Sequence, residues 1–279
     1  MTRAATPLHS CTVHPGPVPG THAVQMHSAR AFGKHWHDSF GFGLMDEGGQ
    51  VSASGRGQVL ALAGQIITTN PGEVHDGVPL QHQARRWRMV YLTPQALADL
   101  LGHTSGQDLE LTRPVLDDPL LRTALARLFH HLNTPPTATG HALQEEQLAH
   151  ASGLLVQRHG NRVPAHERPR PLQAVCECLL DQMQAPPTLA TLAELVGLSR
   201  FQLVRQFAQA HGLPPFAWLQ QHRLCHAQAL IAGGAPLSDA ALDSGFADQS
   251  HLTRAFTRHL GYTPGTWRLA LRPPAHRLQ

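Results

Sequence analysis

The spacing of apolar residues changes along the chain and divides it into parts of different structure. Between residue 21 and about residue 93, short apolar runs such as VLAL and QIITT alternate with Gly-rich turn signals, as in short strands joined by tight turns. PLLRTALARLFHHL (119–132) and HALQEEQLAHASGLLVQRH (141–159) instead carry apolar residues at helical spacing. The pattern predicts a strand-rich half, built as a sandwich or a barrel, followed by two helices.

A segment without periodicity separates these helices from the carboxy-terminal part. GNRVPAHERPRP (160–171) holds three prolines and four charged residues, a composition that favours a linker. From Leu172 to about Leu271 the spacing is helical throughout, so the predicted fold class is α+β with two domains. The expected parts are a flexible amino terminus (1–20), a β-barrel (21–112), a helical segment that packs on the barrel or dimerises (113–159), the linker (160–171), an all-α domain (172–272) and a tail (273–279).

Two short segments of the all-α domain share one skeleton. Each reads Leu-x-Arg-x-Phe, four residues, Gly, two residues and Pro, starting at Leu203 and at Leu252. A short helical stretch precedes each, with a glycine, Gly197 or Gly245, where the chain must reverse through a conformation costly for other residues. This layout predicts two helix-turn-helix units, whose second helices enter the DNA major groove. The expected units lie near 191–212 and 239–261.

The arginine of each unit is predicted to face outward. At about 100° per residue, the leucine and phenylalanine that flank it share the opposite face of the helix and anchor it to the core. An outward arginine can pair with guanine or hold a phosphate. The structural alternative is an amphipathic repeat with no role in DNA binding. Two units with identical internal spacing favour DNA binding, with two helices in successive major grooves about 34 Å apart.

These segments also resemble a known family. LAELVGLSRFQLVRQFAQAHGLPP, HRLCHAQALI and SGFADQSHLTRAFTRHLGYTPGTWR are similar to the DNA-binding domain of AraC/XylS-type transcriptional regulators. The resemblance implies a non-enzymatic, sequence-specific regulator that binds double-stranded DNA, RNA polymerase and a second copy of itself, with Arg223 in a structural position. The resemblance and the outward face together give the DNA-binding candidates Phe201, Val204, Arg205, Gln249, Ser250, His251, Arg254 and Arg258.

Three histidines mark the strand-rich half. His35 and His37 in KHWHD alternate, so on a strand both face one side, and His75 follows a turn in PGEVH. The arrangement is similar to the cupin barrel, the effector domain of many AraC-type regulators, in which an HxH pair, a later histidine and a glutamate can hold a divalent metal. That glutamate is missing here. The alternatives are a site for a small-molecule effector, which we expect without a cofactor, a divalent metal held by three imidazoles, and a structural role.

The strand RRWRMVYL (85–92) alternates arginines with aromatic and apolar residues. One face is therefore cationic and the other aromatic. If the cationic face points into the barrel, Arg88 can clamp a carboxylate effector in bidentate fashion; if it points outward, it is a solvated surface. Arg88 thus joins the histidines as a candidate for effector binding.

Composition limits the class of protein. With 42% hydrophobic and 15% charged residues, the chain is typical of a globular protein. No apolar run reaches the roughly 18 residues of a membrane helix, and the first residues lack the apolar core of a signal peptide. We therefore expect a cytoplasmic protein with no membrane partner. Its net charge of +3 is mild, so specificity should depend on base contacts and DNA shape more than on bulk charge.

Two other functions are compatible with parts of this pattern. A metal-dependent cupin enzyme with a helical accessory domain would use the three histidines, although it lacks the expected glutamate. An architectural protein would bend DNA without reading its bases. The twin helix-turn-helix units favour a sequence-specific transcriptional regulator controlled by a small molecule in the amino-terminal domain.

Overall fold

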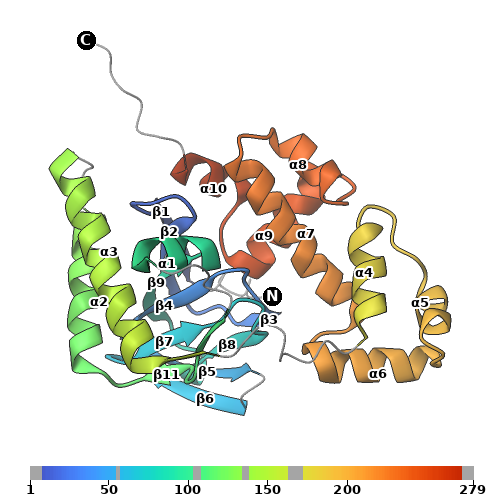
Figure 1. Cartoon of the computed structure of the whole chain (residues 1–279), viewed down its shortest axis with the longest axis horizontal. Coiled ribbons are helices and arrows are strands. Elements are labelled where there is room, and N and C mark those ends of the chain that lie inside the picture. Colours follow the sequence, from blue (N-terminus) through green and yellow to red (C-terminus); the bar gives the residue numbers. More distant parts are fainter. Residues whose placement is uncertain (1–7, 55–56, 103–107, 134–137, 163–171, 272–279) are drawn as a thin grey trace, which may run out of the picture. The chain divides into compact units, whose positions relative to one another are not determined.

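The computed structural model describes residues 8–54, 57–102, 108–133, 138–162 and 172–271. The chain divides into two compact units, residues 1–168 and 169–279 (Figure 1). Within the described residues, the first unit contains the strands, three α-helices and a short 3-10 helix, Leu80–His82, and the second unit is all-helical. The predicted α+β class with a strand-rich amino-terminal half and a helical carboxy-terminal half is confirmed.

The strands of the first unit pair in two main sheets. The larger sheet has the order β1-β2-β9-β4-β7-β11 and the second β3-β8-β5-β6, while β10 and β12 form a separate pair. The described strands do not close into the expected barrel. The sequence could not distinguish the two arrangements, because a sandwich and a barrel share the same alternation of residues and differ only in strand pairing. The strands are β1 His9–Pro15, β2 Thr21–Ser28, β3 Phe32–His35, β4 Phe40–Glu47, β5 Gly49–Ser54, β6 Gly57–Leu62, β7 Ile66–Thr69, β8 His75–Pro79, β9 Arg85–Leu92, β10 Leu109–Leu111, β11 Val115–Leu116 and β12 Gly160–Arg162.

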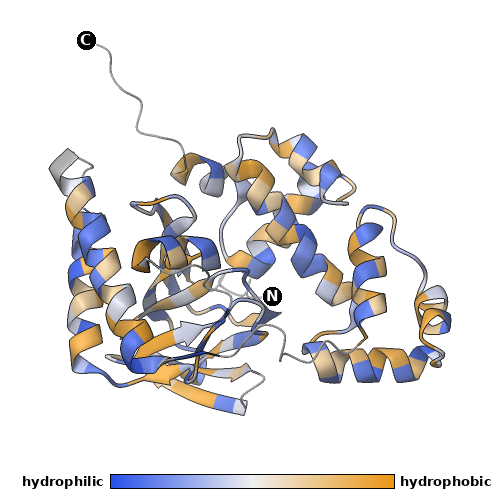
Figure 2. Cartoon of the chain, viewed as in Figure 1, coloured by the Kyte–Doolittle hydropathy of each residue, from blue (hydrophilic) through white to orange (hydrophobic). Residues whose placement is uncertain are grey.

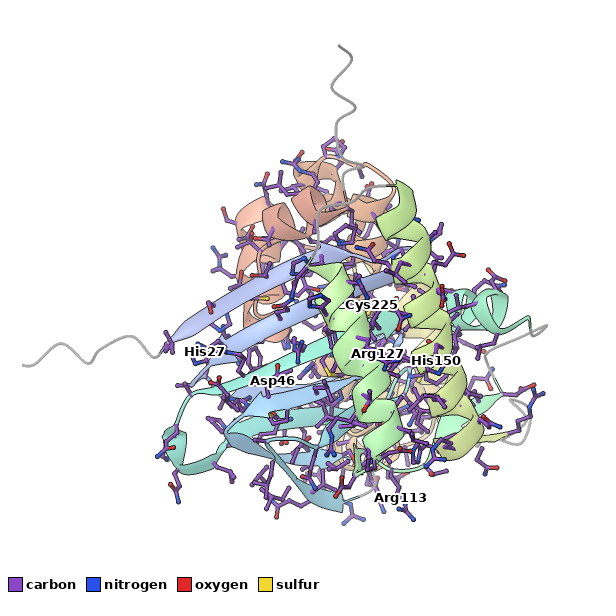
Figure 3. The ribbon with its side chains drawn as sticks, turned by 90° about the vertical axis from the view of Figure 1, so that its left-hand side faces the viewer. His27, Asp46, Arg113, Arg127, His150 and Cys225 are labelled. Carbon is purple, nitrogen blue, oxygen red and sulfur yellow. The ribbon has the colours of Figure 1, made fainter. Side chains whose placement is uncertain are left out.

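One face of the larger sheet packs against helices. The helices are α1 Pro94–Leu101, α2 Pro119–Leu132 and α3 Ala138–His159. Figure 3 shows α2 and α3 side by side across the sheet, with Arg127 labelled on α2 and His150 on α3. Burial of apolar area between these layers is the main stabilising term of the unit. The shared core includes Phe40, Phe42, Leu44, Val90 and Leu92 from the strands and Leu121, Leu125, Leu128, Phe129, Leu148 and Leu155 from the helices.

The opposite face of this sheet packs against the second sheet around a buried arginine. Arg85 of β9 is 1% exposed, and its guanidinium lies 4.5 Å from the Trp87 ring centroid. It donates to the side-chain oxygen of Gln50 on β5 at 2.9 Å and to the carbonyl of Gly77 on β8 at 3.2 Å. Burial lowers the pKa of Arg85 to about 10. Because a buried charge is costly without such partners, this residue fixes the two sheets against each other.

Three segments differ from the boundaries expected from sequence. His9–Pro15, expected to be flexible, forms β1 and pairs along its whole length with β2. Pro94–Leu101, expected within the barrel, forms α1, since Thr93 caps its first turn and proline occupies its first position. Gly160–Arg162 of the expected linker pairs with β10. The rest of the linker, 163–171, and the tail, 273–279, lie outside the described residues.

Asp118 connects the start of α2 to the end of α3. Its buried carboxylate accepts from the backbone N–H of Leu120 at 3.0 Å, from Arg158 Nε at 2.6 Å and from His159 Nε2 at 2.7 Å. Burial by itself would raise the pKa of this carboxyl, but the hydrogen bonds from Arg158 and His159 outweigh it and hold the pKa well below the usual range. The ionised form of Asp118 is thus favoured by folding.

We expect Asp118→Asn to lower the free energy of unfolding by roughly 1–3 kcal/mol at pH 7, because it removes charge-assisted hydrogen bonds. A pKa lowered by folding contributes stability above the unfolded pKa of about 3.9 and loses it as the pH falls toward the folded pKa. The gap between wild type and variant should therefore narrow at pH 3. Thermal unfolding of both proteins at pH 7 and pH 3 measures this difference in the free energy of unfolding. An equal difference at the two pH values would contradict the conclusion that folding favours the ionised form of Asp118.

The second unit consists of seven helices within the described residues. Figure 2 shows hydrophilic and hydrophobic residues alternating around them, as expected for amphipathic helices that bury one face. No described helix of the chain is long and apolar enough to cross a membrane. The helices are α4 Gln173–Asp181, α5 Leu189–Leu195, α6 Arg200–His211, α7 Pro215–Ala232, α8 Leu237–Asp243, α9 Gln249–Leu260 and α10 Pro264–Ala270.

Candidate DNA-binding helices and effector site

The first candidate unit is the pair α5 and α6. Gly197 lies in the turn at φ +66°, where a side chain would be strained. Ser199 then caps α6 through the backbone N–H of Gln202 at 3.2 Å, and the Gln202 side chain accepts from the Ser199 N–H at 2.9 Å. This reciprocal capping fixes where α6 begins, and therefore which of its residues occupy the amino-terminal end that can approach DNA.

The second unit, α8 and α9, repeats this arrangement. Gly245 has φ +77°, and a Cβ there would lie 2.7 Å from the Met183 carbonyl oxygen and 2.8 Å from Arg223 Nε. Glycine is thus required by conformation and by space. Arg223 of α7 donates through Nε to the Met183 carbonyl at 3.0 Å, a structural contact. Asp248 caps α9 by accepting from the His251 N–H.

The inward residues of both second helices are fully buried. Leu203 and Phe207 of α6, and Leu252 and Phe256 of α9, are 0% exposed. Turned away from them, Arg205 and Arg254 are exposed. The alternation inferred from the Leu-x-Arg-x-Phe skeleton therefore holds in three dimensions.

The other predicted DNA-contacting residues divide by exposure. Val204 and His251 are only half-buried, and the His251 ring lies edge-on to Phe246 with centroids 5.3 Å apart, so His251 also supports the turn before α9. Phe201 is 74% exposed, so its ring is available for contact with another molecule. The exposed members of the set are Phe201, Arg205, Gln249, Ser250, Arg254 and Arg258.

The exposed positive charge of the helical, carboxy-terminal unit is concentrated on α6 and α9. RFQLVRQFAQAH and QSHLTRAFTRHL contain two arginines each and no acidic residue. The arginines are Arg200, Arg205, Arg254 and Arg258, all exposed. The mild net charge of the chain therefore understates the positive potential of these two helices, which suits the phosphate backbone of DNA.

In the amino-terminal, strand-rich unit the structure brings the three predicted histidines together. His35 of β3 pairs in register with His75 of β8, and their ring centroids are 4.5 Å apart. His37 follows the end of β3, and its carbonyl accepts from the Gly72 N–H of the turn that precedes His75. One potential ligand atom from each ring lies within 4.8 Å of the others. Pairing between strands far apart in sequence thus builds the cluster.

All three imidazoles are held in the neutral form. Burial lowers the pKa of His35 to about 3, with a further contribution from His75. Burial also lowers the pKa of His75, and it lowers that of His37 together with the neighbouring histidines. Neutral imidazoles are metal ligands and hydrogen-bonding groups, not anion-binding cations.

Sequence reasoning missed a row of residues beside this cluster. Tyr91 of β9 lies opposite His22 of β2 and Gly41 of β4, and Gly41 lies opposite Thr69 of β7. The Tyr91 ring stacks on His22 at 4.9 Å and lies 5.0 Å from the His37 ring. A side chain at Gly41 would collide with Tyr91 and Thr69. The signal in the sequence was a glycine inside an apolar strand, but only the strand register shows that Gly41 lies opposite Tyr91.

Arg88 does not join the histidine cluster. It forms a bidentate ion pair with Asp46, at 2.7 Å and 2.6 Å, and its guanidinium lies 4.9 Å from the Phe129 ring centroid of α2. Asp46 is labelled on the sheet in Figure 3. The cationic face of β9 therefore lies beneath the helices and the aromatic face lies toward the histidines, because the helices cover the face that carries Phe42 and Val90. The effector role expected for Arg88 is not supported by its position.

Two helix-turn-helix units in one helical domain, combined with a two-sheet domain, define a class of DNA-binding regulator that carries a ligand-binding domain. The chain matches the helix-turn-helix domain family over residues 192–270 and the AraC-like ligand binding domain family over residues 20–155. The chain belongs to the AraC-type transcriptional regulators.

Individual relatives agree with this assignment. The chain is 26% identical to the HTH-type transcriptional regulator YbfI of Bacillus subtilis over 79% of this chain and 81% of that protein. It is 32% identical to the transcriptional activator RhaR of Klebsiella pneumoniae, over half of each chain. Unsaturated fatty acid-bound ToxT of Vibrio cholerae has the same fold, with a TM-score of 0.50 and 11% identity over 99% of this chain and 100% of that one.

Proposed function

We propose that α6 and α9 are the base-reading helices of this regulator and that they enter successive major grooves of one DNA duplex. The observation that carries the proposal is the construction of the two helices. Each is anchored by a fully buried leucine and phenylalanine, and each exposes arginines on a surface without acidic residues. Helices fixed in this way can hold side chains at defined base edges.

The exposed residues suit different contacts. Arg205 and Arg254 occupy equivalent positions and can bind guanine O6 and N7 in bidentate fashion. Phe201, with most of its ring exposed, suits contact with a thymine methyl group. Gln249 and Ser250, at the amino-terminal end of α9, can reach base edges or phosphates, and Arg258, one turn beyond Arg254, suits a phosphate.

The remaining parts of the proposal rest on the family. As a regulator of this type, the protein is proposed to act in the cytoplasm, as a homodimer joined through the α2–α3 region, and to contact RNA polymerase. The effector is proposed to bind in the amino-terminal unit beside the histidine cluster. We propose no enzymatic activity, since the relatives are transcriptional regulators.

Selection from a pool of random duplexes tests the proposal. With the full-length protein we expect two short conserved blocks whose centres lie about 10 base pairs apart, one helical turn of DNA. Binding without enrichment of any sequence would indicate an architectural role in place of base reading. Failure to bind any duplex, with or without a metabolite extract, would contradict the proposed function itself.

A further inference from the structure

We propose that His35, His37 and His75 bind one divalent transition-metal ion, and that the effector is a small anion whose oxygen atoms bind to that ion. The metal site follows from the amino-terminal unit alone. The identity of the anion as the effector rests on the proposed regulatory function.

The geometry of the cluster is close to that of a three-histidine metal site. Metal–nitrogen distances of about 2.0–2.1 Å in a tetrahedral site place the ligand atoms about 3.3 Å from one another. The ligand atoms of the three histidines already lie within 4.8 Å of one another. His35 and His75 come from paired strands and lie opposite each other in register, so the backbone holds these two residues together. Three protein ligands leave a fourth position open.

Two of the rings are oriented by the backbone. Nδ1 of His35 lies 2.7 Å from the Gly33 carbonyl, and Nδ1 of His75 lies 2.8 Å from the Glu73 carbonyl. A carbonyl oxygen can only accept, so each Nδ1 carries the proton and each Nε2 keeps its lone pair. Metal-binding histidines are commonly fixed in this way, with the second ring nitrogen donating to a carbonyl or carboxylate.

The charge of the site indicates the class of its exogenous ligand. The ligand set contains no carboxylate, so three neutral imidazoles leave the full charge of a divalent ion. Asp76, which follows His75, is not among the potential ligands, and one of its carboxylate oxygens accepts from the Ala53 N–H at 2.7 Å. An anion bound in the open position would supply the missing negative charge, and carboxylates are suitable oxygen donors for such ions.

The row beside the cluster offers polar contacts for that anion. The Tyr91 ring lies 5.0 Å from the His37 ring, and its phenolic hydroxyl can donate a hydrogen bond. Thr69 lies on the other side of Gly41 in the same row. Its buried hydroxyl has no hydrogen-bond partner within the described residues, and such a group is costly unless a ligand or water satisfies it. Because Gly41 has no side chain, Thr69 Oγ1 and the Tyr91 ring can both lie against its backbone.

Titration of the tag-free, chelator-treated full-length protein with Co²⁺ tests the metal site. We expect one equivalent to bind and to give the visible absorption of a four-coordinate ion. His75→Gln and His37→Ala should each weaken Co²⁺ binding by more than about 10–100-fold, the usual effect of losing only an outer-shell partner. His150→Ala is the matched control, since His150 is exposed on α3, and it should bind as wild type does. Circular dichroism establishes that each variant is folded.

Two results would overturn the metal site. One is the absence of stoichiometric Co²⁺ binding to folded wild-type protein. The other is binding that the folded His75→Gln and His37→Ala variants retain with unchanged affinity and spectrum, because the ion would then lie elsewhere.

Acetate and oxalate test the open position. Either anion should shift the visible bands of the Co²⁺ protein while the ion stays bound, as followed by equilibrium dialysis, and Thr69→Val should weaken that shift severalfold. Unchanged bands with both anions would overturn the anionic-ligand part of the inference. The two proposals can fail separately. Enrichment of a DNA sequence without metal binding removes this inference alone. Metal binding without enrichment removes the proposed function, and with it the role of the anion as effector, but leaves the metal site.

Discussion

Leu252→Ala is expected to lower the free energy of unfolding of the carboxy-terminal unit by about 2–5 kcal/mol. Leu252 is fully buried in α9, where truncation leaves a cavity that the surrounding helices fill only in part. Chemical denaturation, followed by a probe that reports on the helical unit, measures the loss. DNA affinity should fall with it at temperatures near the transition, because α9 loses its anchor.

The matched control is Leu242→Ala in α8. Leu242 is 56% exposed, and the same substitution at an exposed position typically changes stability by no more than about 0.5 kcal/mol. Equal losses for the two variants, or an unchanged transition in Leu252→Ala, would contradict the inward orientation of Leu252 and with it the outward orientation of Arg254.

Arg254→Ala and Arg205→Ala are each expected to cost about 1–3 kcal/mol in binding to the selected duplex. Each change should relax base preference in one of the two blocks and leave the other block intact, because the two arginines belong to separate helices. Repeating the duplex selection with each variant, together with binding curves at fixed salt, measures both effects. Because the sites are independent, the double variant should lose about the sum of the two costs.

Arg113→Ala is the control for charge. Arg113 is exposed and lies in the amino-terminal unit, so its loss removes the same charge without touching α6 or α9. If Arg254→Ala weakens binding to all duplexes equally, and with a smaller salt dependence, Arg254 contacts a phosphate and does not read a base.

Much of the carboxy-terminal unit could be predicted because its signals are local. Helical spacing, the turn glycines and the paired Leu-x-Arg-x-Phe segments all act within a few residues. They fix which side of each helix is buried before any distant contact forms. The structure places Leu203 and Phe207 inside and Arg205 outside, as the sequence requires. Local spacing could not predict that Arg223 and Met183 lie close to Gly245, because these residues are distant in sequence.

The amino-terminal unit was less predictable because its arrangement depends on pairing between distant strands. Alternation along 85–92 separated a cationic from an aromatic face, but only the position of α2 decided that Arg88 lies under the helices, paired with Asp46. The same alternation fits a barrel and two sheets. The start of α1, by contrast, has a local signal, because Thr93 caps the helix and Pro94 is its first residue. This segment was nevertheless expected within the barrel, since it follows a strand directly.

The sequence by itself determined the class of the protein, the two helix-turn-helix units and the outward direction of their arginines, since each depends on residues within one or two helical turns. The tertiary structure decided that His35, His37 and His75 meet, that their rings are neutral and that Tyr91 and Thr69 lie beside them. These contacts join residues from five strands and loops, and their distances are set by register and sheet packing. No pattern along the chain encodes a distance between strands that are not neighbours in sequence.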